Sequence, residues 1–309
     1  MKMTNNDDTP LERTYVREQA RRREARAALL PERQITPVLE KDKYKKWDKC
    51  FLTPDLGRNE IEPNVVYKDG KQIKFLLLPK VISEAAWLKA LLAAQESHLN
   101  SSSRAANGQV YGKKLTLGWI KLRYPGYDNI RTAPTLEQPQ LVAALYPLLH
   151  EMDAAMDEKI PKYHDYAWNC AMNAIRPEEE RDDLSRVTDP HELLIVKNLD
   201  PWDWTYTIRA TPFSTIELNH NIVFKAHEDG HNVEGTCVCI TALGSFAGGR
   251  LVFPRYGYSA ELGNRDLLVC DNNHELHGNL GPIVGDRYSV VAFLHNSVLG
   301  RTPLQIKRL

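Results

Sequence analysis

The residues best suited to chemistry are concentrated in residues 224–232, which read FKAHEDGHN. His227, Asp229 and His231 are all of types that ligate metals, and two interpretations compete. On a helix, His227 and His231 would share one face and complete the H-E-x-x-H signature of a zinc protease. At the end of a strand, His227 and Asp229 would project to the same side, as two ligands of the 2-His-1-carboxylate triad of non-haem iron.

The residues on either side favour the strand interpretation. Residues 213–224, FSTIELNHNIVF, alternate as a strand does, and residues 232–240, NVEGTCVCI, lead into another strand. Gly230 lies inside the segment, where it would weaken a helix. The zinc-protease alternative is therefore the weaker one.

The third ligand must come from a distant part of the chain. After the strand-like LLVC of residues 267–270, the segment DNNHELHGN offers His274 and His277. We choose His277, because ten residues later Arg287 opens Arg287-Tyr288-Ser289 on the next predicted strand. In such oxygenases a basic residue at about that offset neutralises the distal carboxylate of 2-oxoglutarate, and the planar guanidinium pairs with a carboxylate bidentately. Ser289, on the same face, can add a hydrogen bond.

Together these residues predict a specific reaction chemistry. Three protein ligands on one face of an octahedral iron(II) leave two positions for the keto acid and one for dioxygen. Each motif alone is weak, but the order H-x-D, GGRLVFP (residues 248–254), His277 and R-x-S is more specific. The sequence predicts an iron(II)- and 2-oxoglutarate-dependent dioxygenase.

The segment His227–Asn232 is similar to the H-x-D-x-H-N pattern of the TET methylcytosine dioxygenases, and GGRLVFP, HGN and RYS resemble the wider TET/JBP superfamily. The resemblance covers roughly residues 205–296. It implies iron bound by His227, Asp229 and His277. It also implies 2-oxoglutarate bound by Arg287 and Ser289, with His231 and Asn232 near the target base.

The resemblance implies DNA as the substrate, with 5-methylcytosine oxidised to 5-hydroxymethylcytosine, and leaves the extent of further oxidation open. Thymine hydroxylation or demethylation of an N-methylated base is the first alternative, because the chain lacks the cysteine-rich region of the animal enzymes and looks like compact members with varied base preference. A hydroxylase of small molecules or proteins, and a catalytically silent DNA-binding jelly roll, are the others.

Base oxidation would require the base to be flipped out of the duplex. Asn219 and Asn221, two apart on the predicted strand, could face the cavity, although strand-end hydrogen bonding explains them as well. The loop of residues 100–114 carries Arg104, Lys113 and Lys114 and is a candidate DNA-clasping element, or a plain mobile loop.

The elements that position these residues predict an α+β fold. From about residue 205 many short strands follow one another, typical of a double-stranded β-helix (jelly roll). Before it, residues 73–82 predict a buried strand and turn, and residues 83–97 a helix with Ser83 as N-cap. Residues 139–160 predict a second helix, which Pro147 breaks near its middle or begins. We expect these helices to brace the β-helix core.

Residues 1–50 form a basic extension, with 13 Lys and Arg against 9 Asp and Glu, and residues 11–30 predict an Arg-rich helix. The role of this helix stays open between a solvated surface and a phosphate contact. We expect residues 51–309 to be a single dioxygenase domain, with its β-helix core at about 205–300, and the protein to be a monomer.

The whole chain of 309 residues has no net charge, which argues against an unspecific polyanion binder. The five cysteines are scattered, and we expect reduced thiols, with Cys237 and Cys239 in the core. With no secretory signal at residues 1–10 and no apolar run of about eighteen residues, we expect no membrane segment and an intracellular, in a eukaryote nuclear, location.

Overall fold

The structure of the chain is a computed structural model. It describes residues 30–40, 46, 48–101, 112–120, 130–131, 137–174, 206–208, 211–273 and 275–299. The Arg-rich helix predicted at residues 11–30, Arg104 and His274 lie outside these residues.

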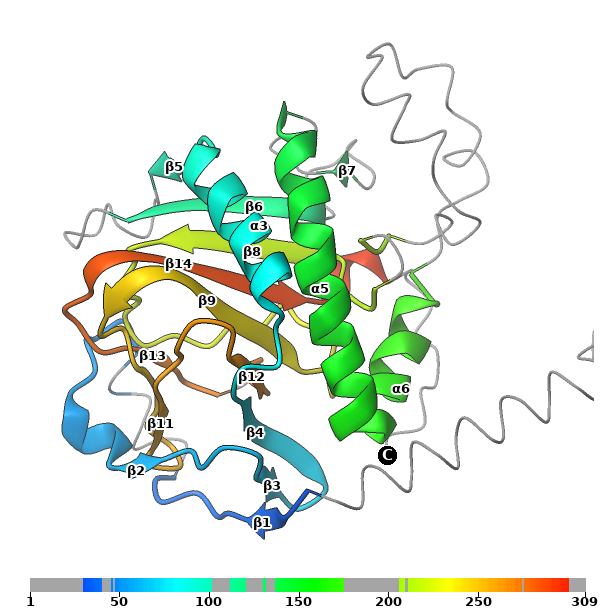
Figure 1. The fold of residues 1–309 in the computed structure, drawn as a ribbon. Coiled ribbons are helices and arrows are strands. Elements are labelled where there is room, and N and C mark those ends of the chain that lie inside the picture. Colours follow the sequence, from blue (N-terminus) through cyan, green and yellow to red (C-terminus); the bar gives the residue numbers. More distant parts are fainter. Residues whose placement is uncertain are drawn as a thin grey trace, which may run out of the picture.

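Two β-sheets form the body of the described part of the chain (Figure 1). The large sheet has the strand order β1-β3-β4-β12-β9-β14-β8-β6-β5, with β7 beside β6. Its strands are β1 (Glu32–Gln34), β3 (Val66–Asp69), β4 (Gln72–Leu78), β5 (Asn100–Ser101), β6 (Lys113–Ile120), β7 (Ile130–Arg131), β8 (Thr215–His220), β9 (Val238–Ala247), β12 (Leu267–Cys270) and β14 (Val284–Phe293). The small sheet has the order β13-β10-β11-β2, with strands β2 (Asn59–Glu60), β10 (Leu251–Phe253), β11 (Tyr258–Ala260) and β13 (Gly278–Asn279).

Helices cover one face of the large sheet, where α3 and α5 run across its central strands (Figure 1). The helices are α3 (Glu84–Glu96), α5 (Pro139–Lys159) and α6 (Pro161–Ala171), with short 3-10 turns η2 (Pro54–Gly57) and η5 (Asn296–Val298). Ser83 caps α3 as predicted, because its side-chain oxygen accepts a hydrogen bond from the backbone N–H of Ala86. Pro147 neither breaks nor begins α5, contrary to our expectation: it lies inside one helix of residues 139–159.

The two faces of the large sheet serve different purposes. Along β14, Tyr288, Val290 and Ala292 pack into the core shared with α3 and α5. The alternate residues Arg287, Ser289 and Val291 point to the other face, because side chains alternate along a strand. A second core fills part of the space between the two sheets, with Phe75 and Phe253 in contact at a ring-centroid distance of 4.4 Å.

The predicted α+β fold with helices bracing a jelly-roll core is confirmed, and it extends further toward the N-terminus than we expected. β1 pairs in parallel with β3, so residues 32–34, which we had placed in the extension, belong to the large sheet. Cys237 and Cys239 are buried in the core as predicted, and all five cysteines are free thiols.

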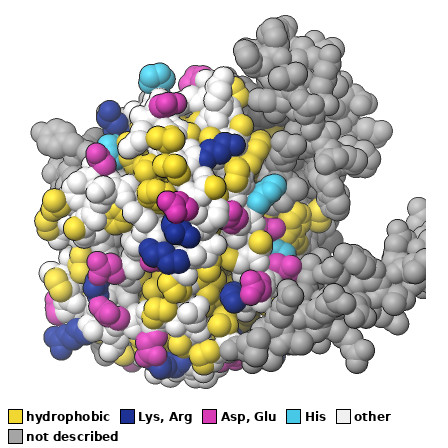
Figure 2. Space-filling view, viewed as in Figure 1, with side chains coloured by type: hydrophobic (Ala, Val, Ile, Leu, Met, Phe, Trp, Pro, Cys, Tyr) yellow, Lys and Arg dark blue, Asp and Glu magenta, His cyan; other side chains and the backbone are white. Residues whose placement is uncertain are grey.

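The surface over α3 and α5 carries positive and negative side chains interspersed with apolar ones (Figure 2). Leu88 and Leu92 of α3 are among these exposed apolar side chains. No helix within the described residues is both long and apolar enough to cross a membrane.

Candidate metal and co-substrate site

The structure brings His227, Asp229 and His277 together. One potential ligand atom from each lies within 4.8 Å of the other two. The Nε2 atom of His227 is 3.4 Å from Oδ1 of Asp229, and Nε2 of His277 is 3.9 Å from Oδ2 of the same carboxylate. Residues 224–232 form no helix, which removes the basis of the zinc-protease alternative.

Backbone pairing places the two histidines side by side although fifty positions separate them. His227 and His277 form an isolated antiparallel bridge, in which each backbone N–H donates to the carbonyl of the other at 2.9 and 3.0 Å. Gly278 follows directly, and a Cβ atom there would lie 3.0 Å from both the nitrogen of Ala226 and the carbonyl oxygen of Phe224. The glycine of the H-G-N motif thus permits the close approach of the two segments.

Hydrogen bonds to the backbone orient both imidazole rings. Nδ1 of His227 donates to the carbonyl of Lys225 at 2.8 Å, and Nδ1 of His277 donates to the carbonyl of Glu275 at 2.9 Å. With the proton on Nδ1, the lone pair of each Nε2 is directed toward Asp229, as metal-ligating histidines require. Two imidazoles and one carboxylate therefore form a donor set that fits iron(II).

A cavity between the two sheets opens beside these ligands. It is lined from β8 and β14 of the large sheet, from β10 and β13 of the small sheet, and from the connecting loops. The lining residues are Glu217, Asn219, Phe224, His227, Asp229, Ile240, Leu251, Leu262, Asn272, His277, Asn279, Arg287, Ser289 and Val291.

Arg287 is the strongest sign of a bound anion in this cavity. Its side chain is buried, yet no described residue places a carboxylate within ion-pair distance of it, and its Nε atom has no hydrogen-bond partner among them. The guanidinium lies over the ring of Phe246, 5.4 Å from the centroid, and burial lowers the pKa of Arg287 to about 10. Because a buried unpaired charge is costly, a carboxylate such as that of 2-oxoglutarate fits this position.

Ser289 and Asn219 flank the guanidinium on the cavity face. They are directly opposite each other in the β8–β14 pair, and Nδ2 of Asn219 donates to Oγ of Ser289 at 3.5 Å. Oδ1 of Asn219 is buried and has no hydrogen-bond partner among the described residues. Both predicted side chains therefore line the cavity beside Arg287.

Two further residues hold Arg287 in place. Gly249, at φ +77°, lies against it, since a Cβ atom there would be 3.2 Å from Cδ and Nε of Arg287. Asn221 follows the second interpretation given for it, hydrogen bonding at the end of the strand, and is not among the residues that line the cavity: β8 ends at His220, and Asn221 takes φ +52°. Its side-chain oxygen accepts a hydrogen bond from the backbone N–H of Arg287 at 2.8 Å, and its own N–H donates to the carbonyl of Arg287.

The resemblance implies that His231 and Asn232 lie near the target base, but the two side chains differ in their burial and contacts. His231 is exposed and its ring stacks with that of His295, 5.6 Å away between centroids. Asn232 is buried, its N–H donates to Oδ1 of Asn273, and its side-chain Nδ2 donates to Oδ1 of Asn272 at 3.4 Å. Asn232 is not among the residues that line the cavity, but it is hydrogen-bonded to Asn272, which is.

Asn272 lines the cavity beside His277, although the sequence did not single it out. Its Nδ2 atom lies 3.4 Å from Nε2 of His277. The only sequence signal was its place in the DNNHELHGN segment, where three amide or acidic residues precede the histidines. Glu217 was also missed; it lines the cavity and forms a 2.7 Å ion pair with Lys114.

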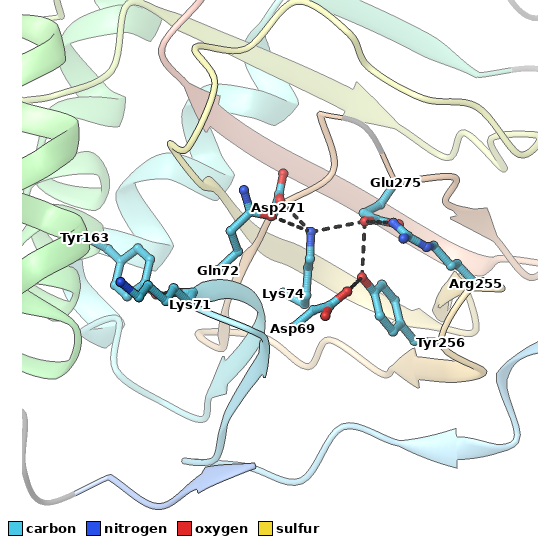
Figure 3. A network of polar contacts seen from close by, with 9 residues as sticks. All are labelled: Asp69, Lys71, Gln72, Lys74, Tyr163, Arg255, Tyr256, Asp271 and Glu275. Atoms are coloured by element: carbon cyan, nitrogen blue, oxygen red, sulfur yellow. Dashed lines mark hydrogen bonds and ion pairs between the residues drawn. The ribbon is translucent and has the colours of Figure 1, made fainter. Parts of the chain in front are cut away.

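A buried network of charges supports the loop that carries Asn272 and His277 (Figure 3). Nζ of Lys74, on β4, lies 2.9 Å from Oδ2 of Asp271 and 3.1 Å from Oε1 of Glu275. Glu275 also accepts from Arg255 at 2.6 Å and from the hydroxyl of Tyr256 at 3.3 Å. The network thus holds Asp271 and Glu275, which precede His277 in the chain. The backbone carbonyl of Glu275 in turn orients the ring of His277.

The pKa values of Lys74 and Glu275 are both shifted by burial and by the charges of the network. Burial disfavours the charged form of Lys74, but Asp271 and Glu275 outweigh it, so the pKa of Lys74 is raised. Burial also raises the pKa of Glu275, against the opposing pull of Lys74 and Arg255. A positive charge on Lys74 is therefore firmly held.

Comparisons with known proteins agree with this geometry. The family model Tet_JBP, the oxygenase domain of the 2OGFeDO superfamily, matches residues 130–296, more than half of the chain. The thymine dioxygenases JBP1 of Leishmania infantum and Leishmania major are each 34% identical over 73 residues, which is 23% of this chain but 9% of those proteins. The alignment thus spans about a tenth of the length of these relatives.

Among solved structures, NgTET1 in complex with 5mC DNA has a TM-score of 0.53 and 11% sequence identity, and the match covers 93% of this chain and 92% of that one. At this identity the likeness shows a shared fold. The family match, the shared fold and the paired metal and anion positions lead to one conclusion: the chain belongs to the TET/JBP oxygenase family and is an iron(II)- and 2-oxoglutarate-dependent dioxygenase.

Proposed function

We propose that this enzyme oxidises the 5-methyl group of 5-methylcytosine in DNA, with iron held by His227, Asp229 and His277 and with 2-oxoglutarate held by Arg287 and Ser289. The observation that carries the proposal is the buried, unpaired guanidinium of Arg287 in the same cavity as the three clustered ligand side chains. The family match supports oxidation of a DNA base as the class of reaction.

Iron(II), 2-oxoglutarate and dioxygen together supply an oxidant for an unactivated C–H bond, with succinate and carbon dioxide as by-products. The residues of the chain prepare the site for it. The backbone carbonyls of Lys225 and Glu275 keep the Nδ1 protons of the two histidines away from the metal. Arg287 neutralises the far carboxylate of the co-substrate, and the apolar Ile240, Leu251 and Val291 limit the access of water.

A base inside a duplex would not reach this site, because His277 is only 5% exposed and the ligands lie between two sheets. We therefore propose that the target base is flipped out of the helix. Because its substrate is DNA, we also propose an intracellular location for the enzyme, which in a eukaryote is the nucleus. We further propose that the enzyme is a monomer.

Glu217 supports 5-methylcytosine over thymine. The two bases carry their methyl group at the same ring position but differ in their edges, since cytosine presents an amino donor where thymine presents a carbonyl acceptor. The Glu217 carboxylate pairs with Lys114 at 2.7 Å and retains acceptor capacity for the amino group, whereas it has no hydrogen to donate to the carbonyl. The amide side chains of Asn272 and Asn219 can donate or accept a hydrogen bond, so they do not distinguish the two bases. We therefore assign the discrimination between 5-methylcytosine and thymine to Glu217.

Thymine is the second candidate, favoured by the similarity to the thymine dioxygenases of Leishmania. The discriminating experiment incubates the full chain with iron(II) and 2-oxoglutarate on two duplexes of equal sequence, one with 5-methylcytosine and one with unmethylated cytosine. Nucleosides are then quantified by mass spectrometry. We expect 5-hydroxymethylcytosine from the first duplex, whereas hydroxymethyluracil from both would favour thymine.

Two variants complete this experiment. Asp229→Ala should abolish the product while the protein keeps its circular dichroism spectrum, since a ligand is lost and the fold is not. Glu217→Gln, whose amide can donate, should lower the ratio of 5-methylcytosine to thymine oxidation several-fold. An unchanged ratio would remove Glu217 from base selection, and succinate production without either base product would point to a substrate other than these bases.

A further inference from the structure

A second cluster of metal-ligand side chains lies at the junction of α5 and α6, outside the dioxygenase cavity. Asp157, His164 and Asp165 each offer a ligand atom, and these atoms lie within 4.8 Å of one another. Asp153 and Asp157 are four residues apart on α5, so both face the same side of that helix, where His164 of α6 lies. Asp157 is partly buried and Asp165 is exposed, so the cluster is open to solvent on one side.

The hydrogen bonds of His164 determine which of its nitrogen atoms carries a proton. Nε2 is 2.7 Å from Oδ1 of Asp153, a distance that requires a proton between them. The indole N–H of Trp168 donates to the same carboxylate oxygen at 3.0 Å. The same indole N–H also lies 2.9 Å from Nε2 of His164. Because the 2.7 Å contact with a carboxylate oxygen needs a proton on Nε2, we assign Nε2 as a donor and Asp153 as the acceptor from both rings.

The second ring nitrogen, Nδ1, is left without a role in the protein's own hydrogen bonding. His164 is only 5% exposed, and Nδ1 is buried without a hydrogen-bond partner among the described residues. Oδ1 of Asp157 faces it at 3.4 Å. A buried imidazole that donates through one nitrogen to a carboxylate and leaves the other for an ion is the arrangement found at metal sites.

The spacing also suits a metal ion. Ligand bonds of about 2.0–2.2 Å in a tetrahedral zinc site separate neighbouring ligand atoms by roughly 3.4 Å, the distance between Nδ1 of His164 and Oδ1 of Asp157. One imidazole and two carboxylates leave the fourth position for water. Such mixed nitrogen and oxygen ligands suit a divalent transition-metal ion.

We propose that Asp157, His164 and Asp165 bind a divalent transition-metal ion such as Zn²⁺, with Asp153 as the positioning residue for His164. The site joins the last turn of α5 to the first turns of α6. It is independent of the iron site and would tie α6 to the helix that covers the large sheet (Figure 1).

The test counts metal ions bound by the chelator-stripped full chain after equilibrium dialysis against Zn²⁺, measured by mass spectrometry. A His227→Ala/His277→Ala background removes the iron ligands, so failure of the proposed function cannot affect the count. We expect one equivalent in this background and none after His164→Gln is added. Glutamine was chosen because its amide can still donate to Asp153 while it removes Nδ1.

His150→Gln is the matched control, because His150 is an exposed histidine on α5 outside the cluster, and it should keep the one equivalent. Co²⁺ offers a second readout, since its visible absorption bands should appear in the background and vanish with His164→Gln. If that variant fails to fold, Asp165→Asn, at an exposed position, should weaken Zn²⁺ binding at least tenfold. No bound zinc in the background, or equal binding in all variants, would overturn the proposal.

Discussion

At the scale of single residues, Arg287 differs from Arg250 and Arg255, two arginines close to β10 in the chain. Arg250 pairs with Glu60 at 2.6 Å and Arg255 with Glu275 at 2.6 Å, whereas Arg287 has no carboxylate partner among the described residues. Its burial lowers its pKa to about 10, which still leaves it charged at neutral pH. The buried positive charge of Arg287 is therefore complementary to a bound anion such as a carboxylate of 2-oxoglutarate.

Arg287→Lys tests this complementarity at constant charge. Lysine cannot form the two parallel hydrogen bonds of a guanidinium, so we expect the concentration of 2-oxoglutarate that gives half-maximal turnover to rise about 10- to 30-fold, equivalent to roughly 1.4–2 kcal/mol. Succinate formation against 2-oxoglutarate concentration measures it. Arg250→Lys, in an exposed pair, should leave that concentration unchanged, and equal behaviour of the two variants would contradict the role of Arg287.

The same scale shows where the sequence was informative. The ligands and Arg287 could be predicted because each belongs to a short motif at the end of a strand, and their order along the chain is specific. Of the two interpretations open for Asn221, the structure has hydrogen bonding at the end of the strand, because the backbone turns to a positive φ after His220 and the period-two argument assumes a strand that continues. The place of Asn272 in the DNNHELHGN segment was its only signal, and no motif distinguished Glu217, because the pairing of distant strands brings both residues to the cavity.

At the scale of elements, the loop 271–277 depends on the buried charges around Lys74. This lysine is 4% exposed and pairs with two carboxylates of the loop. Lys74→Met removes the cation but leaves Asp271 and Glu275 buried, with only Arg255 still neutralising Glu275. We expect the free energy of unfolding to fall by about 3 kcal/mol, measured by urea denaturation.

Lys80→Met is the control for this loss. Lys80 pairs with Asp266 at 3.4 Å, but its side chain is 58% exposed, so water already screens the pair. We expect little change in its unfolding free energy. A similar effect of both variants would mean that the buried network contributes no more than a surface pair.

The turn between β9 and β10 makes a second prediction at this scale. Gly249→Ala combines a positive φ with a Cβ atom 3.2 Å from the side chain of Arg287, so the guanidinium must shift. We expect a weakened response to 2-oxoglutarate, about tenfold or more, besides a loss of stability of roughly 1 kcal/mol from the backbone. Gly70→Ala separates the two effects: Gly70 has φ +59° but nothing within 4 Å of its Cβ position, so only stability should fall.

At the scale of the whole molecule, long-range pairing sets what the sequence could predict. The pattern of short strands after residue 205 indicated the jelly roll, and the 3.6-residue periodicity indicated α3 and α5. The pairing of β12 with β4, which aligns Leu267 with Leu78, joins segments nearly two hundred residues apart. No local pattern specifies such a register, so the contribution of β1, β3 and β4 to the large sheet was not foreseen.

The cavity between the two sheets couples ligand binding to the stability of the whole fold. Its ligands and its anion site come from β8, β14, β13 and the loops between them, so a bound metal and 2-oxoglutarate connect segments that separate on unfolding. We expect Mn²⁺, which oxygen and nitrogen ligands accept, to raise the melting temperature without turnover, and 2-oxoglutarate to raise it further only when Mn²⁺ is present. At a hundred times the dissociation constant, each ligand adds roughly 2.7 kcal/mol, which a thermal-shift assay under nitrogen resolves. Arg287→Ala should keep the increment from Mn²⁺ and lose the increment from 2-oxoglutarate. In a His164→Gln background, which removes the proposed second metal site, Asp229→Ala should lose both. A 2-oxoglutarate increment that survives Arg287→Ala would place the anion elsewhere in the molecule.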